Sequence, residues 1–454
     1  MMGPLRLSQI QESLQGSLSG DDCAFTGVSI DSRTLQPGDL YIAIPGERFD
    51  GHEFASQAAL AGAVAVLGEQ AMAVALPQMQ VADSRIALGQ LAAMNRQGFT
   101  GSLVAITGSC GKTTTKEMLA AVLGQSGNTL YTRGNLNNEI GAPLTLLRLN
   151  PETRYAVIEL GASGLGEIAW TVSLAAPELA LITNASEAHL EGFGSLENIV
   201  QAKGEIIDGL GPKGQVVLNR DEPAFPRWQA RAGQRRVITV STREVSAADY
   251  RAESITSTDR GQQFLCCRSD GSRTPVSLGL SGRHNVANAL QVIAAAEALG
   301  IEASQWQPAL AAINAAPGRL QREPLSAQVT LLDDSYNANP ASMSAALATL
   351  AQEPRRRIAV LGDMAELGTE SQALHQAMGA KAMALGIEHL LVCGTYAPDY
   401  RQGSQGAALL ADTHEHLINQ LMPLLDRPCT VLIKGSRSAA MDQLVVLLKK
   451  RITG

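Results

Sequence analysis

Apolar and polar positions follow three successive patterns along the chain. Up to residue 82, VSIDSRTLQPGDLYIAIPG predicts two short strands split by a Pro-Gly-Asp turn, and HEFASQAALAGA and VAVL predict a helix and a strand. Next, a helical SRIALGQLAAMNRQ precedes the strand-like run SLVAIT, and the runs YAVIEL, ELALITN and QVVLN follow with helices between them. This alternation is typical of a parallel α/β sheet.

A second alternating series follows the predicted helix at 283–299. The runs VTLLDD, RRRIAVLG, HLLVCG and CTVLIKG are separated by helical segments, which indicates a doubly wound, Rossmann-type sheet. We therefore predict an α/β protein of three domains: a small α/β domain at residues 1–82, a central parallel-sheet domain at 83–314, and a Rossmann-like domain at 315–454.

One predicted helix, SLENIVQAKGEIIDGL at 195–210, has a charged residue on its apolar face. Its apolar residues recur at intervals of three to four, and Lys203 interrupts that stripe between Val200 and Ile206. The simplest interpretation is that the lysine stem lies on apolar surface while its ammonium reaches water. A functional interpretation needs support from the rest of the chain.

Composition and net charge limit the kinds of binding partner and the cellular compartment that we expect for this chain. The 454 residues carry 36 basic and 43 acidic side chains, a net charge of −7, which does not favour nucleic acid. The RAGQRR cluster near residue 236 is interpreted as solvated surface. The six cysteines show no CxxC pair, and neither a signal peptide nor a run of transmembrane length is apparent. We expect a cytoplasmic protein without membrane or nucleic-acid partners, and a monomer by default.

The segment AITGSCGKTTTKEML predicts a phosphate-binding loop between a strand and a helix. Its glycines let backbone amides curl around a phosphate, Lys112 adds charge, and Thr113 offers a hydroxyl to Mg²⁺. Compared with the common GxxxxGK[ST] pattern, Ile106 replaces the first glycine. A glycine-rich helix start without a ligand would not explain the adjoining lysine and threonines. The expected ATP-binding residues are Thr107, Gly108, Ser109, Cys110, Gly111, Lys112, Thr113 and Thr114.

Two further side chains follow strands of the same predicted sheet. Glu159 ends the run YAVIE, where open α/β sheets place ligand-binding residues, and His189 lies just beyond ELALITN. A glutamate at this point can hold Mg²⁺ as the more common aspartate does, whereas a lone histidine is usually structural. A phosphate loop alone would fit a GTPase switch, a kinase, a motor or a ligase.

Several motifs together distinguish these classes. ITGSCGKTTTKEM, GNLNNEIGAPLTLL, VIELGAS, AHLEGFGS, AKGEI, GRHNVANAL, PGR, DDSYNANPASM, LGDMAELG and VLIKGSRSAAM span almost the whole chain. In combination they resemble the ATP-dependent Mur ligases of peptidoglycan synthesis. Within the family, NLNNEIGAPLTLL and DDSYNANPASM look most like the ligase that adds D-alanyl-D-alanine to UDP-N-acetylmuramoyl-tripeptide (UDP-MurNAc-tripeptide).

Other members and other classes remain alternatives. The ligase that adds the third amino acid, diaminopimelate or lysine, normally carries a DNPR-type motif, which is absent here. Folylpolyglutamate synthetase shares the second and third domains, but VSIDSRTLQPGDLYIAIPGERFDGHEF resembles the uridine-nucleotide domain of the Mur ligases. A regulatory nucleotide switch is the alternative from outside the enzymes.

The resemblance implies a division of labour among the three domains. The first domain would hold the uridine diphosphate, the central domain Mg-ATP, and the third would close over ATP and bring the dipeptide. For each asparagine, turn chemistry is the alternative. The implied residues are Asp31, Ser32, Arg33, Phe49, Asp50 and His52 for the uridine nucleotide; His284, Asn285, Asn288, Arg319, Asp334, Tyr336, Asn337 and Asn339 for ATP; Asn135, Asn137 and Asn138 for the muramoyl-peptide; and Lys434, Ser436 and Arg437 for substrate or dipeptide carboxylates.

The implied chemistry gives Lys203 a role. A substrate carboxylate would attack ATP to give an acyl phosphate, which the dipeptide amine would then attack. Lys112, Glu159 and His189 would act there, with Mg²⁺ on Thr113, Glu159 and His189. These ligands are few for two Mg²⁺ ions. In Mur ligases the lysine of the AK element is typically carbamylated, and burial would favour the neutral amine this needs. We therefore expect Lys203 to be N6-carboxylysine and a further metal ligand.

Overall fold

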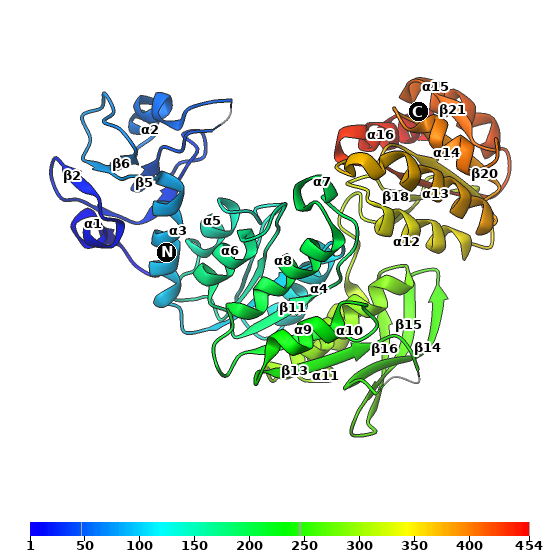
Figure 1. Ribbon diagram of the computed structural model, residues 1–454, viewed down its shortest axis with the longest axis horizontal. Helices are drawn as coiled ribbons and strands as arrows, with labels where there is room; N and C mark the ends of the chain where they lie inside the picture. Colours follow the sequence, from blue (N-terminus) through cyan, green and yellow to red (C-terminus); the bar gives the residue numbers. More distant parts are fainter. Residues whose placement is uncertain (47, 245–246, 454) are drawn as a thin grey trace.

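The structure, a computed structural model, describes residues 1–46, 48–244 and 247–453. Three sheets of five or more strands lie with their helices in succession along the molecule, from the blue N-terminal end to the red C-terminal end (Figure 1). The predicted α/β class with three domains is confirmed, while the exact domain boundaries stay predictions. No helix in these described ranges is long and apolar enough to cross a membrane.

The first sheet has the strand order β2-β7-β6-β5-β4, and a two-stranded pair lies beside it. Helix α3 then leads into the central domain, where it packs against α5 and α6. One apolar core extends from the first domain through α3 into the central sheet. Buried residues of the first domain, of α3 and of the central sheet all belong to one contiguous cluster. The elements are β1 (Leu5–Arg6), α1 (Leu7–Leu14), β2 (Ser17–Ser19), β3 (Ala24–Phe25), β4 (Gly27–Ser29), β5 (Asp39–Ile42), η1 (Gly51–Phe54), α2 (Ala55–Leu60), β6 (Ala65–Gly68), β7 (Gln78–Gln80) and α3 (Ser84–Gln97).

The central sheet has nine strands in the order β16-β15-β14-β13-β12-β11-β8-β10-β9. Strands β8 to β14 are parallel, as predicted. Strands β15 and β16 continue the sheet as an antiparallel ribbon that the sequence patterns did not predict. The strands are β8 (Ser102–Thr107), β9 (Thr129–Tyr131), β10 (Tyr155–Glu159), β11 (Leu179–Ile182), β12 (Gln215–Asn219), β13 (Arg236–Ser241), β14 (Tyr250–Thr258), β15 (Gly261–Arg268) and β16 (Arg273–Leu278).

Helices cover both faces of this sheet, which explains why its strands are continuous apolar runs. Side chains of β8 alternate between two buried clusters, with Leu103 on one face and Val104 on the other. The first face is covered by α5 (Gly141–Leu146), α6 (Glu167–Ala175), α8 (Leu196–Asp208) and α9 (Phe225–Ala232), and the second by α4 (Lys112–Gly124), α10 (Arg283–Ala298) and α11 (Ala303–Ala312).

The third sheet has the order β17-β18-β22-β19-β20-β21 and is parallel except for the edge strand β17. Helices lie on both faces, so the doubly wound pattern is confirmed. The elements are β17 (Gln321–Pro324), β18 (Val329–Asp334), α12 (Pro340–Ala351), β19 (Arg356–Leu361), η2 (Gly368–Glu370), α13 (Ser371–Ala384), β20 (His389–Cys393), α14 (Ala397–Gly403), β21 (Leu409–Ala411), α15 (His414–Leu421), η3 (Met422–Leu425), β22 (Cys429–Lys434), η4 (Arg437–Ala439) and α16 (Met441–Thr453).

Candidate active site

The phosphate loop joins β8 to α4 and is built around two glycines with positive φ. Gly108 has φ +145° and Gly111 has φ +81°. A Cβ at Gly108 would collide with Thr183 Oγ1, and one at Gly111 would touch Asn288. Only glycine fits this backbone closely against its neighbours. The result is a strand, a tight loop and a helix N-terminus, an arrangement that fits the phosphates of a nucleotide.

Side chains that follow β11 hold the loop in shape, and the sequence analysis did not identify them. Asn184 Oδ1 accepts from the Cys110 amide at 2.9 Å, and Thr183 Oγ1 donates to the Cys110 carbonyl at 2.6 Å. The Ser186 amide donates to Ser109 Oγ at 3.0 Å. The polar run TNAS directly after a buried strand was the available signal. These bonds fix the loop before any nucleotide arrives.

Thr113 and Glu159 form the candidate Mg²⁺ site. Thr113 Oγ1 donates to Glu159 Oε2 at 3.0 Å, and Asn137 Nδ2 donates to Glu159 Oε1 at 2.8 Å. The carboxylate is buried, with Lys116 Nζ 3.9 Å away. A hydroxyl and a carboxylate beside a phosphate loop are the oxygen ligands that Mg²⁺ takes together with phosphates and water. The described residues contain no cluster of three or more acidic, histidine or cysteine side chains that could hold a metal alone.

Lys203 lies on the inward face of α8, and its side chain is 2% exposed. Its ammonium sits 5.0 Å from the centre of the Phe193 ring and forms no hydrogen bond or ion pair within the described ranges. Most of the lysine side chain is therefore shielded from water. Burial, followed by the charge of Lys112, lowers the pKa of Lys203 to about 7. It does not line the cleft described below, although it is close enough to Lys112 to be affected by its charge.

His189 links the central domain to the third domain. It precedes the short helix α7 (Leu190–Phe193), has the left-handed conformation with φ +56°, and its Nδ1 pairs with a Glu366 carboxylate oxygen. The Glu191 amide also donates to the Glu366 carbonyl at 3.2 Å. His189 was expected near ATP from its place after a strand, whereas its acidic partner Glu366 was not predicted.

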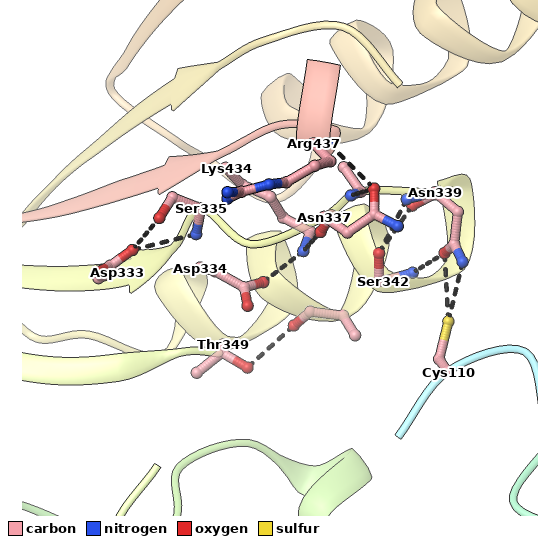
Figure 2. Close-up of polar contacts among 12 residues, drawn as sticks. Cys110, Asp333, Asp334, Ser335, Asn337, Asn339, Ser342, Thr349, Lys434 and Arg437 are labelled. Carbon is pink, nitrogen blue, oxygen red and sulfur yellow. Dashed lines mark hydrogen bonds and ion pairs between the residues drawn. The ribbon is translucent and has the colours of Figure 1, made fainter. Parts of the chain in front are cut away.

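The third domain contributes a polar wall, shown in Figure 2. Lys434 Nζ donates to Asp334 Oδ2 at 2.6 Å and to the Asn337 carbonyl at 2.9 Å. Asn339 caps α12 and contacts Cys110 Sγ of the phosphate loop, at 3.1 Å from Nδ2 and 3.3 Å from Oδ1. Figure 2 therefore shows the two domains meeting at the loop. Because Asp334 and Lys434 engage each other, their separate roles toward ribose and carboxylates stay predictions.

The segment between the domains adds a cation. Arg319 follows Gly318, and its guanidinium lies 4.2 Å from the centre of the Tyr336 ring. On the central side, Asn288 Nδ2 donates to Asn285 Oδ1 at 3.1 Å, next to the phosphate loop. These side chains, with His284, line the cleft.

These groups enclose a cleft of about 570 Å³ between the central and third domains. It receives 19 of the predicted residues, whereas Thr107, Gly108, Asn138, Lys203 and Ser436 lie outside its wall and Arg437 lines a neighbouring pocket. The Asn138 side chain accepts from the Gly141 amide, which is turn chemistry, and Ser436 is fully buried. The wall comprises Ser109, Cys110, Gly111, Lys112, Thr113, Thr114, Asn135, Asn137, Glu159, His189, His284, Asn285, Asn288, Arg319, Asp334, Tyr336, Asn337, Asn339 and Lys434, together with unpredicted residues that include Asn184, Asn219 and Glu222.

The residues predicted for the uridine nucleotide lie in the first domain. Asp31 pairs with Arg33 at 2.7 Å, and the Arg33 side chain is 85% exposed. Asp50 Oδ1 lies 2.6 Å from His52 Nδ1, and His52 Nε2 accepts from the Glu69 amide, so this histidine has a structural role. Ser32 is near Gln57, while the Phe49 ring is largely exposed. Their ligand roles stay predictions.

Glu222 is a cleft residue that the sequence analysis missed, although it follows the strand run QVVLN. Burial raises the pKa of its carboxyl to about 7, from 4.5. The native state therefore binds this proton more tightly than the unfolded state, and stability from this group falls as pH rises from about 4.5 through about 7.

Glu222→Gln is accordingly expected to stabilise the protein more at pH 8 than at pH 5, by on the order of 1–2 kcal/mol. Glutamine keeps the acceptor for the Ala185 amide but carries no buried charge. Thermal unfolding of both proteins at the two pH values measures this. The exposed Glu152→Gln serves as a control, and an equal shift at both pH values would contradict the prediction.

Comparisons with known proteins agree with this geometry. Family models match residues 24–96 as Mur ligase family, catalytic domain, residues 106–296 as Mur ligase middle domain, and residues 318–437 as Mur ligase, glutamate ligase domain. The UDP-N-acetylmuramoyl-tripeptide–D-alanyl-D-alanine ligase of Escherichia coli (strain K12) is 47% identical over 98% of this chain and 99% of its own. The enzyme of that name from Haemophilus influenzae is 36% identical over 99% of each chain.

Solved structures show the same relation. A crystal structure of MurF from Acinetobacter baumannii matches with a TM-score of 0.93 and 33% identity, over 99% of each chain. The MurF ligase of Thermotoga maritima in complex with ADP matches with a TM-score of 0.84 and 26% identity, over 94% of this chain and 98% of its own.

The chain belongs to the Mur ligase family, whose members are ATP-dependent ligases. Within the family its similarity is to the MurF type, the D-alanyl-D-alanine ligases, rather than to the ligase that adds the third amino acid. The resemblance drawn from the sequence motifs is thus confirmed.

Proposed function

We propose that this enzyme joins D-alanyl-D-alanine to UDP-MurNAc-tripeptide, using ATP and forming an acyl phosphate, ADP and phosphate on the way to the UDP-MurNAc-pentapeptide. The observation that carries the proposal is the convergence of the phosphate loop, Glu159 and the Asn337–Asn339 wall on one cleft. The named function of relatives that span the whole chain supports this substrate pair. A regulatory switch would need no such wall in a third domain.

ATP fits the cleft with its phosphates at the loop. The Lys112 ammonium donates to the Gly108 carbonyl at 2.7 Å, which places its positive charge at the phosphate loop. Lys112 and Arg319 supply positive charge where two phosphates and the incoming carboxylate repel one another. The buried Asn285 and Asn288, with His284, would border the adenine.

Thr113 and Glu159 would hold Mg²⁺, with His189 as a further candidate. When bound, the ion would neutralise charge on the phosphate oxygens. The protein's own contribution is geometric, because Asn137 fixes one Glu159 oxygen while Thr113 is placed by the first turn of α4. Asn135 and Asn137 line the cleft on the side where the muramoyl-peptide would enter.

We also propose that Lys203 is carbamylated. Its burial and lack of a partner favour the neutral amine, which can attack CO₂. A C–N bond forms, one N–H proton passes to solvent, and the product is an anionic carbamate. This would convert a buried cation that feels the charge of Lys112 into a group with carboxylate-like oxygens, which would complement Lys112 and suit Mg²⁺.

The proposed function is tested by phosphate release from ATP in the presence of UDP-MurNAc-tripeptide. Release is expected with D-alanyl-D-alanine and not with diaminopimelate, lysine or single alanine, and the pentapeptide product is identified by mass. Release with a single amino acid but not with the dipeptide would assign the chain to the sister ligase. ATP hydrolysis at a rate that neither UDP-MurNAc-tripeptide nor D-alanyl-D-alanine changes would indicate a regulatory nucleotide switch.

A further inference from the structure

A second, smaller pocket adjoins the ATP cleft. It has a volume of about 440 Å³ and lies where α7 meets the third domain. Four wall residues line both cavities, so the small pocket lies directly beside the cleft: His189, Asn337, Ala338 and Asn339.

Charged groups and small apolar groups form the rest of its wall. Glu366 supplies a carboxylate and Arg437 a guanidinium, while Ala188, Ala338 and Ala365 supply methyl groups. One anion, one cation and several methyl contacts match a short zwitterion with small side chains. A nucleotide would not suit this pocket, because it carries several negative charges and a large ring.

The backbone around Glu366 is fixed in an unusual conformation. Glu366 has φ +61°, and its partner His189 has φ +56°. Non-glycine residues in this region cost on the order of 1 kcal/mol or more and concentrate at functional sites. The preceding turn is anchored by Asp363, which accepts from the Thr395 and Tyr396 amides, and by the buried His375, which accepts from the Met364 amide at 2.9 Å.

A cation opposite the Glu366 carboxylate would be electrostatically favourable. A glutamate beside a site for ATP and an acyl phosphate adds repulsion unless it faces positive charge. Glu366 Oε2 pairs with His189, and Oε1 has no partner among the residues that the structure describes. The side chain is 54% exposed toward the pocket and solvent, so a further N–H donor can approach it.

Arg437 is similarly available. Its guanidinium is 68% exposed and bonds Asp442 at 3.1 Å, an exposed pair that contributes little and can be exchanged. Its backbone amide donates to Asn337 Oδ1 at 3.3 Å, which fixes the start of η4 at the pocket (Figure 2).

We infer that Glu366 binds the ammonium of the incoming dipeptide, while Arg437 at the other charged wall of the pocket receives its carboxylate. The alanine walls then face the two methyl groups. This assignment rests on the proposed function, since it names residues for its second substrate. It gives the LGDMAELG motif a role that the sequence analysis left open.

Glu366→Gln is expected to raise KM for D-alanyl-D-alanine about 10- to 100-fold, the effect of losing one charge-assisted hydrogen bond. KM for ATP and for UDP-MurNAc-tripeptide should stay within twofold, and Glu366→Asp should restore part of the loss. Glu370→Gln, exposed and four residues further along, is the matched control.

A substrate analogue tests the other end of the pocket. The wild type should discriminate against D-alanyl-D-alaninamide, which lacks the carboxylate, about 10-fold or more, and Arg437→Ala should discriminate much less. If the wild type is inactive with the dipeptide, the proposed function fails. If the wild type is active but Glu366→Gln leaves the KM for the dipeptide unchanged, only the present inference is overturned. The same holds if Glu366→Gln raises the KM values for all three substrates together, because Glu366 would then serve only to hold the two domains together.

Discussion

Replacing Lys203 with alanine is expected to lower the rate of ligation on the order of a thousandfold while the protein stays folded. The substitution removes the carbamate that we propose as a metal ligand, and it leaves a buried space beside Phe193 where the lysine side chain lay. Short carboxylates such as acetate or propionate should enter this space, supply the missing oxygens and restore part of the activity.

Rescue is measured as phosphate release against carboxylate concentration. The exposed Lys213→Ala should be as active as the wild type and unaffected by carboxylates. Independently of activity, ¹³C NMR with labelled bicarbonate should show a carbamate signal in the wild type and none in Lys203→Ala. Full activity of the variant without added carboxylate would refute the proposal.

Lys112→Met is expected to lower kcat/KM for ATP by on the order of a thousandfold, because the charge closest to the transferred phosphate is lost. Among the residues that the structure describes, its ammonium donates hydrogen bonds to loop carbonyls alone, at 2.7 and 3.4 Å, so thermal stability should change little.

Lys116→Met, one turn further along α4, is the matched comparison. Lys116 is fully buried and donates to the Thr132 carbonyl at 2.7 Å, which ties α4 to the chain after β9. Its loss should lower the unfolding temperature. Rate assays and thermal unfolding of both variants separate the two effects, and unimpaired turnover of Lys112→Met with ATP would contradict the first assignment.

Features with a local cause were predictable from the sequence. The glycine loop, the strand runs and the stripe of α8 each depend on spacing within about fifteen residues, and all three appear in the structure. The inward position of Lys203 followed from the same periodicity. Whether the ammonium would reach water could not be predicted, because that depends on Phe193 and the neighbouring elements that cover it.

Features that depend on distant contacts were missed. Asn184 supports the phosphate loop from 74 residues away, and Glu366 meets His189 across 177 residues and a domain boundary. The antiparallel ribbon β15–β16 had a local signal that was overlooked, because its strands are more polar than the parallel series and the turn sequence SDGS separates them. Asn138 was expected to contact the muramoyl-peptide, but its side chain accepts a hydrogen bond from the Gly141 amide and so stabilises a local turn.

Arg319 lies in the segment that joins the central and third domains. The neighbouring wall of the third domain carries Tyr336, whose ring lies against Arg319, and Asn339, which contacts the phosphate loop. The hinge and part of the site are therefore one stretch of chain. Under the proposed function, a rotation that moved the third domain away from the central domain would also withdraw Arg319, so bound ATP would face an incomplete set of charges. Hydrolysis without ligation would then be suppressed until the domains met again, and the frequency of that motion would set an upper limit on turnover.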